Sequence, residues 1–254
     1  MEYFTFGMKE LRVTQNYNGT TSHKPHWYKS KDFADYPIDI AGADGGQDIY
    51  YATVDMKVVA IRGIGSSYTN TIWLVATEKC NTPIGEITPF IALTHWNDDD
   101  PYIKDLYDGK IISAETPICK EGIDGATANH LHLVCGNADR GCGDNLIKNS
   151  NGKWVSNGYC MKPEEIMYID RSFTTNEIWG GCLVWKDKPQ IQYYPKVSYK
   201  GSSIVDGLRS IGVNSSFLNR SKIAKKNGIK NYVGTAKQNT QLLNLLKQGR
   251  LISE

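Results

Sequence analysis

Short apolar runs separated by turn-forming residues fill the first 172 residues of the chain. The runs with β-type composition lie at 48–52, 57–61, 71–75, 90–95 and 130–134. Glycines and the polar stretches 81–83 and 97–101 separate them, which is typical of strands joined by tight turns. The pattern predicts a mainly β domain, built on an antiparallel β-sheet, over residues 1–185.

The hydrophobic period changes after Gly201. Apolar residues recur with helical spacing at 204–211 and again at 242–246. Ser215-Ser216 and Thr235 have the composition of helix N-caps, and Gly228 and Gly249 that of helix ends. We therefore predict a small all-α module of three helices over 201–254, joined to the β domain by a linker at 186–200 that contains Pro189 and Pro195.

Charge divides the chain at the same place. Residues 201–254 contain nine Lys and Arg but two Asp and Glu, a net charge of +7, so the first 200 residues carry −5 of the total of +2. A basic module on an acidic body indicates an anionic partner. Nucleic acid is one candidate partner and an anionic cell-wall polymer is another; the module shows few exposed-looking aromatic residues for base stacking, which argues against nucleic acid.

Two features bear on the compartment. No apolar run approaches the ~18 residues of a membrane span, and residues 1–6 lack the basic and apolar parts of a signal peptide. We expect synthesis in a cytoplasm without a signal peptide. The six cysteines include no CxxC pair, so reduced and partly buried thiols are expected rather than disulfides or a zinc cage.

The candidate chemistry lies in the histidines. His130 and His132 form an HxH pair in an apolar run, where residues i and i+2 of a strand point to the same face. His95 ends another apolar run. Asp39 interrupts the run 36–42, and a carboxylate buried there costs several kcal/mol unless it is paired or bound to metal. A metal site is favoured over unrelated polar groups in the core.

The order of these motifs resembles that of the M23 (lysostaphin/LytM-like) zinc metallopeptidases, in particular endolysins of phages that infect Gram-positive bacteria. The resemblance rests on the stretches Ser22-His23, Asp39-Ile40-Ala41-Gly42, Ala92-Leu93-Thr94-His95 and Asn129-His130-Leu131-His132. It covers about the first 170 residues. The stretches 205–213 and 232–240 similarly resemble the helical wall-binding modules of some lysins.

The resemblance implies a role for each residue. Asp39 and His132 correspond to zinc ligands, His130 to a catalytic histidine and His95 to the second catalytic histidine. The first ligand departs from the family pattern, because Asp35 stands where many members have His. We favour His23 as the first ligand, then His26, then Asp35, since imidazole is the usual partner in a mixed nitrogen and oxygen site. The insertion 25–29 has two interpretations, a substrate-facing flap or a plain surface loop.

The resemblance also implies an activity. Two histidines and one carboxylate leave zinc a position for water, with His130 as base or proton shuttle and His95 stabilising the oxyanion or protonating the leaving amine. The substrate would be peptidoglycan, hydrolysed at a peptide bond after the enzyme is released to the wall. Three alternatives stay open: a tail-associated lysin, a D-Ala-D-Ala carboxypeptidase and a non-catalytic wall-binding relative.

Overall fold

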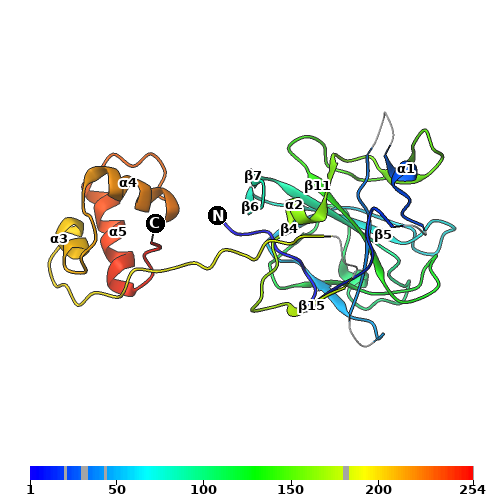
Figure 1. Ribbon diagram of the computed structural model, residues 1–254, viewed down its shortest axis with the longest axis horizontal. Helices are drawn as coiled ribbons and strands as arrows, with labels where there is room; N and C mark the ends of the chain where they lie inside the picture. Colours follow the sequence, from blue (N-terminus) through cyan, green and yellow to red (C-terminus); the bar gives the residue numbers. More distant parts are fainter. Residues whose placement is uncertain (20–21, 30–33, 43–44, 180–182, 254) are drawn as a thin grey trace. The chain divides into compact units, whose positions relative to one another are not determined.

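The computed structural model describes residues 1–19, 22–29, 34–42, 45–179 and 183–253. The chain divides into two compact units, Met1–Lys188 and Pro189–Glu254 (Figure 1). The described helices include none that is long and apolar enough to cross a membrane.

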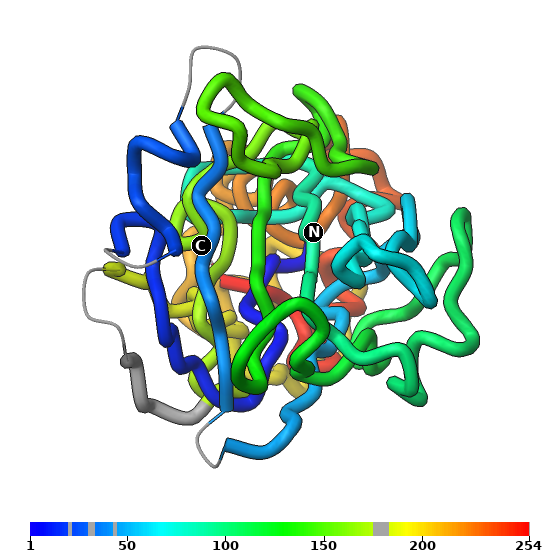
Figure 2. Tube along the Cα trace, turned by 90° about the vertical axis from the view of Figure 1, so that its right-hand side faces the viewer, coloured from blue at the N-terminus to red at the C-terminus, as the bar shows by residue number. Residues whose placement is uncertain are grey.

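The first unit is built around one large sheet. Its main path runs in the order β15-β1-β2-β11-β8-β5-β4-β9, with β14 paired to β11, and every pairing is antiparallel except that of β1 with β15. The strands of this sheet are β1 (Glu10–Gln15), β2 (Ile38–Ala41), β4 (Met56–Arg62), β5 (Thr71–Ala76), β8 (Pro89–Thr94), β9 (Ile111–Ile112), β11 (Leu131–Asn137), β14 (Cys160–Met161) and β15 (Thr175–Trp179). Figure 2 shows β2, β11 and β8 running side by side.

Smaller elements complete this unit. Within the described part of the unit, three two-stranded sheets pair β3 (Ile49–Tyr51) with β10 (Pro117–Lys120), β6 (Cys80–Thr82) with β7 (Gly85–Ile87), and β12 (Leu146–Lys148) with β13 (Trp154–Ser156). The helices are single turns: α1 (Pro25–Tyr28), α2 (Pro163–Ile166) and the 3-10 helix Ile103–Asp105. The prediction of a mainly antiparallel β-domain is confirmed, and each of the five predicted strand runs overlaps an observed strand.

Strand alternation places the main core and the polar chemistry on opposite faces of the sheet. On β11, Leu131 and Leu133 are fully buried in the main core, where they lie opposite Ile40 and Ile38 of β2. Because successive side chains of a strand point to opposite faces, His132 between them faces away from that core.

The second unit holds three helices among its described residues: α3 (Ile204–Arg209), α4 (Phe217–Lys226) and α5 (Ala236–Gln248). Ser216 caps α4, and Thr235 forms a capping box with Gln238 at the start of α5. Gly249 ends α5 in the left-handed conformation, with φ of 70°. These caps and this stop are the ones that the sequence predicts, and fully buried residues of the three helices form a core of their own: Leu208, Ile223, Ala224, Leu242 and Leu246.

The segment 186–200, expected as a linker, makes contacts within both units. Lys188 N donates to Ile169 O in the first unit. Tyr193 forms an isolated bridge with Ile252, and Val197 is buried in the core of the second unit. The structure therefore divides the chain after Lys188 instead of leaving fifteen residues between the units.

The thiols agree with the expectation of reduced cysteines. Cys80, Cys119, Cys135, Cys142 and Cys160 are free, and all except the half-exposed Cys142 are buried. Cys182 lies outside the described residues.

Candidate metal and catalytic site

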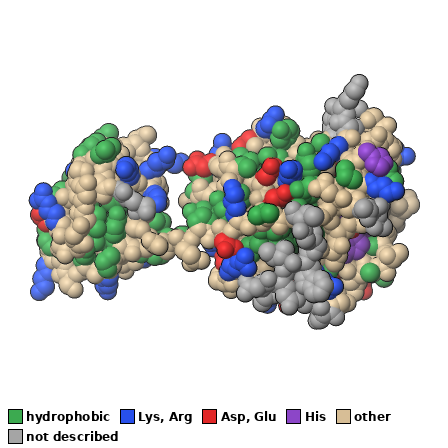
Figure 3. Space-filling view, viewed as in Figure 1, with side chains coloured by type: hydrophobic (Ala, Val, Ile, Leu, Met, Phe, Trp, Pro, Cys, Tyr) green, Lys and Arg blue, Asp and Glu red, His purple; other side chains and the backbone are tan. Residues whose placement is uncertain are grey.

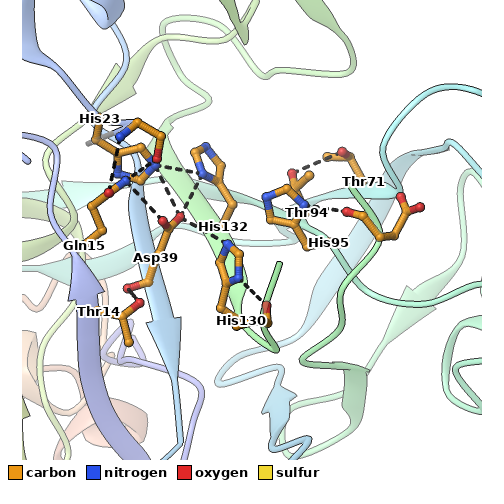
Figure 4. A network of polar contacts seen from close by, with 12 residues as sticks. Thr14, Gln15, His23, Asp39, Thr71, Thr94, His95, His130 and His132 are labelled. Atoms are coloured by element: carbon orange, nitrogen blue, oxygen red, sulfur yellow. Dashed lines mark hydrogen bonds and ion pairs between the residues drawn. The ribbon is translucent and has the colours of Figure 1, made fainter. Parts of the chain in front are cut away.

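The site is built on one row of residues that crosses five adjacent strands. Gln15 of β1 lies opposite Asp39 of β2, and Asp39 lies opposite His132 of β11. His132 lies opposite Thr94 of β8, which in turn lies opposite Thr71 of β5. The hydroxyls of Thr71 and Thr94 are 3.1 Å apart and hydrogen-bonded. The row places a carboxylate and an imidazole side by side on the face that turns away from the main core (Figure 4).

Three ligand-type atoms converge at one end of this row. Asp39 Oδ1 lies 3.1 Å from His132 Nδ1 and 3.3 Å from His23 Nε2, and the two nitrogens are 3.2 Å apart. Zinc–ligand bonds of ~2.0–2.2 Å put neighbouring atoms of a tetrahedral site about 3.3–3.5 Å apart. The three atoms therefore lie almost at the spacing of a tetrahedral zinc site and are the right donors for it.

Hydrogen bonding alone does not satisfy this triangle. Asp39 Oδ1 only accepts, so each of the two imidazoles would have to donate to it. Two N–H groups would then face each other at 3.2 Å. A cation between the three atoms removes this conflict, because each atom then presents a lone pair. The donor set of His23, Asp39 and His132 thus fits a zinc ion.

Protonation states favour the same arrangement. Burial alone would raise the pKa of Asp39, but hydrogen bonds from His132 and His23 hold it far below its ordinary value. Burial lowers the pKa of His23, whose side chain is 2% exposed. The carboxylate is therefore ionised and His23 neutral near pH 7, which are the forms that bind metal.

Gln15 supports two of the three residues. Its amide Nε2 donates to Asp39 Oδ2 at 3.3 Å and to Ser22 Oγ at 2.6 Å, and its Oε1 accepts from Ser22 N. Ser22 directly precedes His23, so a single amide ties the carboxylate to the segment that carries the first histidine. Sequence reasoning missed Gln15. The sequence feature that could have indicated Gln15 is its position at the end of a strand, seven residues before Ser22.

The insertion after His23 is anchored to the rest of the unit. Asn149 Nδ2 donates to Trp27 O at 2.7 Å, and Asn151 Nδ2 donates to His26 O at 2.6 Å. The ring of Tyr28 packs edge-on against His23, with centroids 5.6 Å apart. The short helix α1 therefore holds His23 over the sheet, a role that neither interpretation of this insertion anticipated.

The other two candidates for the first ligand lie elsewhere. His26 is exposed, and its ring packs against Trp27. Asp35 is buried, and its carboxylate accepts from the backbone N–H groups of Ser156 and Tyr36. Neither belongs to the cluster of three donors. Among the described residues the structure thus brings His23, the first choice, to Asp39 and His132.

His130 lies beside this cluster. Its Nε2 is 3.7 Å from Asp39 Oδ1, and its Nδ1 is 2.8 Å from Ala128 O. A carbonyl oxygen only accepts, so Nδ1 carries a proton, and in the neutral ring Nε2 is the acceptor. His130 precedes β11 in an isolated bridge with Gly122 rather than lying within the strand, a small correction to the predicted run.

His95 completes the group from the adjacent strand. It stands just past the end of β8 with φ of 83°, a backbone conformation that costs about 1–3 kcal/mol for a residue with a side chain. Three contacts hold it there: His95 N donates to Asn70 O, Asp124 N donates to His95 O, and His95 Nδ1 lies 2.7 Å from Asp124 O. Its ring centroid is 4.7 Å from that of His130.

The environment of His95 changes the chemistry expected of it. Burial and the neighbouring His132 lower the pKa of His95 to about 4, so its ring is neutral near pH 7. Its Nδ1 donates to the Asp124 carbonyl, which leaves Nε2 as an acceptor. A direct role as donor to an oxyanion would therefore require His95 first to take up a proton.

The comparisons with known proteins give relatives of part of the chain. No family model matches it. An L-alanyl-D-glutamate peptidase of Listeria phage A118 is 53% identical over 126 residues, which cover 40% of this chain and 44% of that protein. An endolysin of Listeria phage A511 is 44% identical over 55 residues, or 22% of this chain and 16% of that protein. The matches thus span less than half the length of either relative.

Solved structures give weaker likenesses. A zinc-containing peptidase from Vibrio cholerae is 16% identical with a TM-score of 0.35, covering 64% of this chain and 41% of that one. A structure of the SpoIIQ–SpoIIIAH pore-forming complex is 13% identical with a TM-score of 0.36, covering 66% of this chain and 92% of that one. At these TM-scores neither structure informs the roles of the residues.

Proposed function

We propose that the chain is a zinc-dependent peptidase and, more particularly, a phage endolysin of the M23 type that hydrolyses peptide bonds of bacterial peptidoglycan. The observation that carries the proposal is the triangle formed by His23 Nε2, Asp39 Oδ1 and His132 Nδ1, with sides of 3.1–3.3 Å. The partial matches to a phage L-alanyl-D-glutamate peptidase and a phage endolysin support the substrate.

In this proposal the three donors of the triangle hold zinc. When bound, the ion supplies a Lewis acid and brings the pKa of a water molecule to roughly 7. The side chains of His130 and His132 are 18% and 20% exposed, so substrate can reach this face of the sheet.

The chain's own residues move the proton. His130 Nε2 is an acceptor beside Asp39, so His130 takes the proton of the attacking water. His95 Nε2 is the second acceptor and lies on the neighbouring ring. The protonated ring can hydrogen-bond to the oxyanion and then pass its proton to the leaving amine, which returns that ring to the neutral form.

Zinc content and turnover separate ligands from proton carriers. Purified protein should hold about one zinc per chain by mass spectrometry, and a chelator should abolish hydrolysis. His23→Ala, Asp39→Ala and His132→Ala should lose the metal. His130→Ala should keep it and lose turnover. His26→Ala is the matched control, because this exposed histidine lies outside the cluster, and it should keep both. Full activity in a metal-free preparation would sink the proposal.

The bond cleaved is identified by the new chain ends. Purified peptidoglycan is digested and the products are analysed by mass spectrometry. A new amino-terminal D-glutamate would place the cut at the L-Ala–D-Glu bond named for the phage A118 relative. Released D-alanine would instead indicate the carboxypeptidase alternative. Wall binding without any new ends would favour the non-catalytic one.

We propose that the second unit binds an anionic cell-wall polymer after the protein has left the cytoplasm in which it is made. Its net charge of +7 over 201–254 supports this. On the face drawn in Figure 3, Lys and Arg side chains spread over this unit with little Asp or Glu among them. A chain truncated after Lys188 should still cut soluble fragments but clear whole cells poorly. Equal clearance by both forms would contradict the wall-binding role.

A further inference from the structure

The surface of the second unit has a cavity of about 600 Å³, broadly open to solvent, beside helix α5. One side is formed by the turn after α4, from Asn227 to Lys230, and the other by a face of α5. The volume lies within the ~300–1,000 Å³ that is usual for ligand sites. We call this cavity the α5 groove.

Uncommitted polar side chains line the α5 face of the groove. Lys237, Gln241, Asn244 and Gln248 are spaced four, three and four residues apart and so form one stripe along the helix. All four are exposed. Among the described residues, none hydrogen-bonds to the side-chain amides of Gln241, Asn244 or Gln248. The side-chain amide of Gln238, on the same helix, is by contrast committed: it completes the capping box of α5 and donates to Asn231 O.

The charged and apolar residues of the groove restrict the chemical class of the ligand further. Lys230 and Lys237 line it, and no described carboxylate forms an ion pair with either. None of the lining residues that the structure describes is acidic. Ile229 and Leu245 are partly buried and add an apolar surface. The groove thus offers cations for an anion, amides for hydroxyl groups and a small apolar surface for carbon chains.

We propose that the α5 groove binds a phosphate-linked polyol chain, so that hydroxyls contact the three amides and a phosphate contacts the lysines. A side-chain amide both donates and accepts hydrogen bonds, as a hydroxyl does. Because the amide is neutral, it favours ligands that carry hydroxyl groups and not every anion. From Lys237 to Gln248 the helix rises about 16 Å, which suits several repeating units. The inference rests on the wall-binding part of the proposed function and locates its site.

The full-length protein is titrated with a synthetic hexamer of ribitol phosphate, and the dissociation constant is measured by calorimetry. The double variant Gln241→Ala/Asn244→Ala should bind about tenfold more weakly, because it loses hydrogen bonds without losing charge. Lys230→Ala/Lys237→Ala should also weaken binding and reduce its dependence on salt. Thr240→Ala on the same helix and Lys222→Ala on α4 are matched controls outside the groove, and both should bind like the unaltered chain.

Two further probes test the ligand class. Polyphosphate of equal charge lacks hydroxyls, and maltohexaose lacks charge. Equally tight binding of polyphosphate would mean that the groove recognises charge alone, and equally tight binding of maltohexaose would mean that it recognises hydroxyl groups alone. Either result would overturn the assignment. So would an unchanged constant in the amide double variant.

The outcome can be separated from that of the proposed function. The variants lie in a unit with its own core, so zinc content and cleavage of soluble peptidoglycan fragments should not change. If the hexamer fails to bind while the full chain still adheres to walls, the groove assignment fails and the wall-binding role stands. If the chain adheres to no wall at all, the broader proposal fails with it.

Discussion

Gln15 should control how tightly the site holds zinc, although it is not a ligand. Its amide contacts Asp39 Oδ2 and Ser22 and so couples the carboxylate to the segment before His23. In Gln15→Ala, Asp39 Oδ2 loses this donor and Ser22 loses a 2.6 Å contact. Both effects loosen ligands that the folded chain otherwise holds within 3.3 Å of each other.

The size of the effect follows from its two parts. Removing a residue that orients metal ligands typically costs 10–100-fold in metal affinity. The contact with Asp39 is long, at 3.3 Å, and on its own suggests the lower end of that range. The short contact with Ser22 adds a freer His23, so we expect zinc to bind about 30-fold more weakly, or about 2 kcal/mol.

Competition with a chromophoric chelator of known zinc affinity measures this change. Thr14→Ala is the matched control, because Thr14 is exposed and its hydroxyl donates to the backbone carbonyl of Asp39 rather than to the carboxylate. It should change zinc affinity less than about twofold. The melting temperature of the metal-free protein is recorded for both variants, so that a general loss of stability is recognised. Unchanged affinity in Gln15→Ala, or an equal loss in Thr14→Ala, would refute the positioning role.

Four other changes test the fold and the site. Gly122→Ala should abolish peptidase turnover while zinc stays bound, because its Cβ would lie 2.3 Å from the carbonyl oxygen of His95; assays of turnover and zinc content check this. Leu133→Ala should lower the free energy of unfolding by about 2–5 kcal/mol, since the side chain is fully buried between neighbouring strands; denaturant unfolding measures it. Thr235→Ala should cost about 1 kcal/mol through loss of the α5 capping box, again by unfolding, and a neutral result would contradict the cap. Burial raises the pKa of the Cys142 thiol to about 11, so its labelling by a thiol reagent should be slow at pH 8 and quicken about tenfold per pH unit below that pKa, because the thiolate reacts; a rate independent of pH would be inconsistent with this.

Local signals explain why the elements could be predicted. The run at 71–75 became β5, and Thr235 and Gly249 became the cap and stop of α5. Alternation, capping and left-handed glycine are properties of a few consecutive residues. The same local reasoning ended one residue too far at His95, which lies beyond β8 because contacts with Asn70 and Asp124 hold its backbone at positive φ.

The domain boundary depended on contacts that local composition does not show. Pro189 and Pro195 suggested a linker, yet Val197 is buried in the core of the second unit. An apolar residue in a proline-containing segment can pack on a distant helix, and its immediate neighbours do not reveal that. The linker prediction rested on the two prolines, and composition of this kind does not show which residues pack on a distant helix.

The sequence by itself determined the chemical character of this protein. It supplied a carboxylate in an apolar run, an HxH pair and a basic helical end, because residue types and short periods carry that information directly. Only the tertiary structure decided which histidine joins Asp39 and His132. His23 reaches them because Gln15 holds Ser22 and because Asn149 and Asn151 anchor the insertion that follows. The two residues of each of these hydrogen bonds lie 7 to 125 positions apart along the chain, and only folding brings them within hydrogen-bond distance.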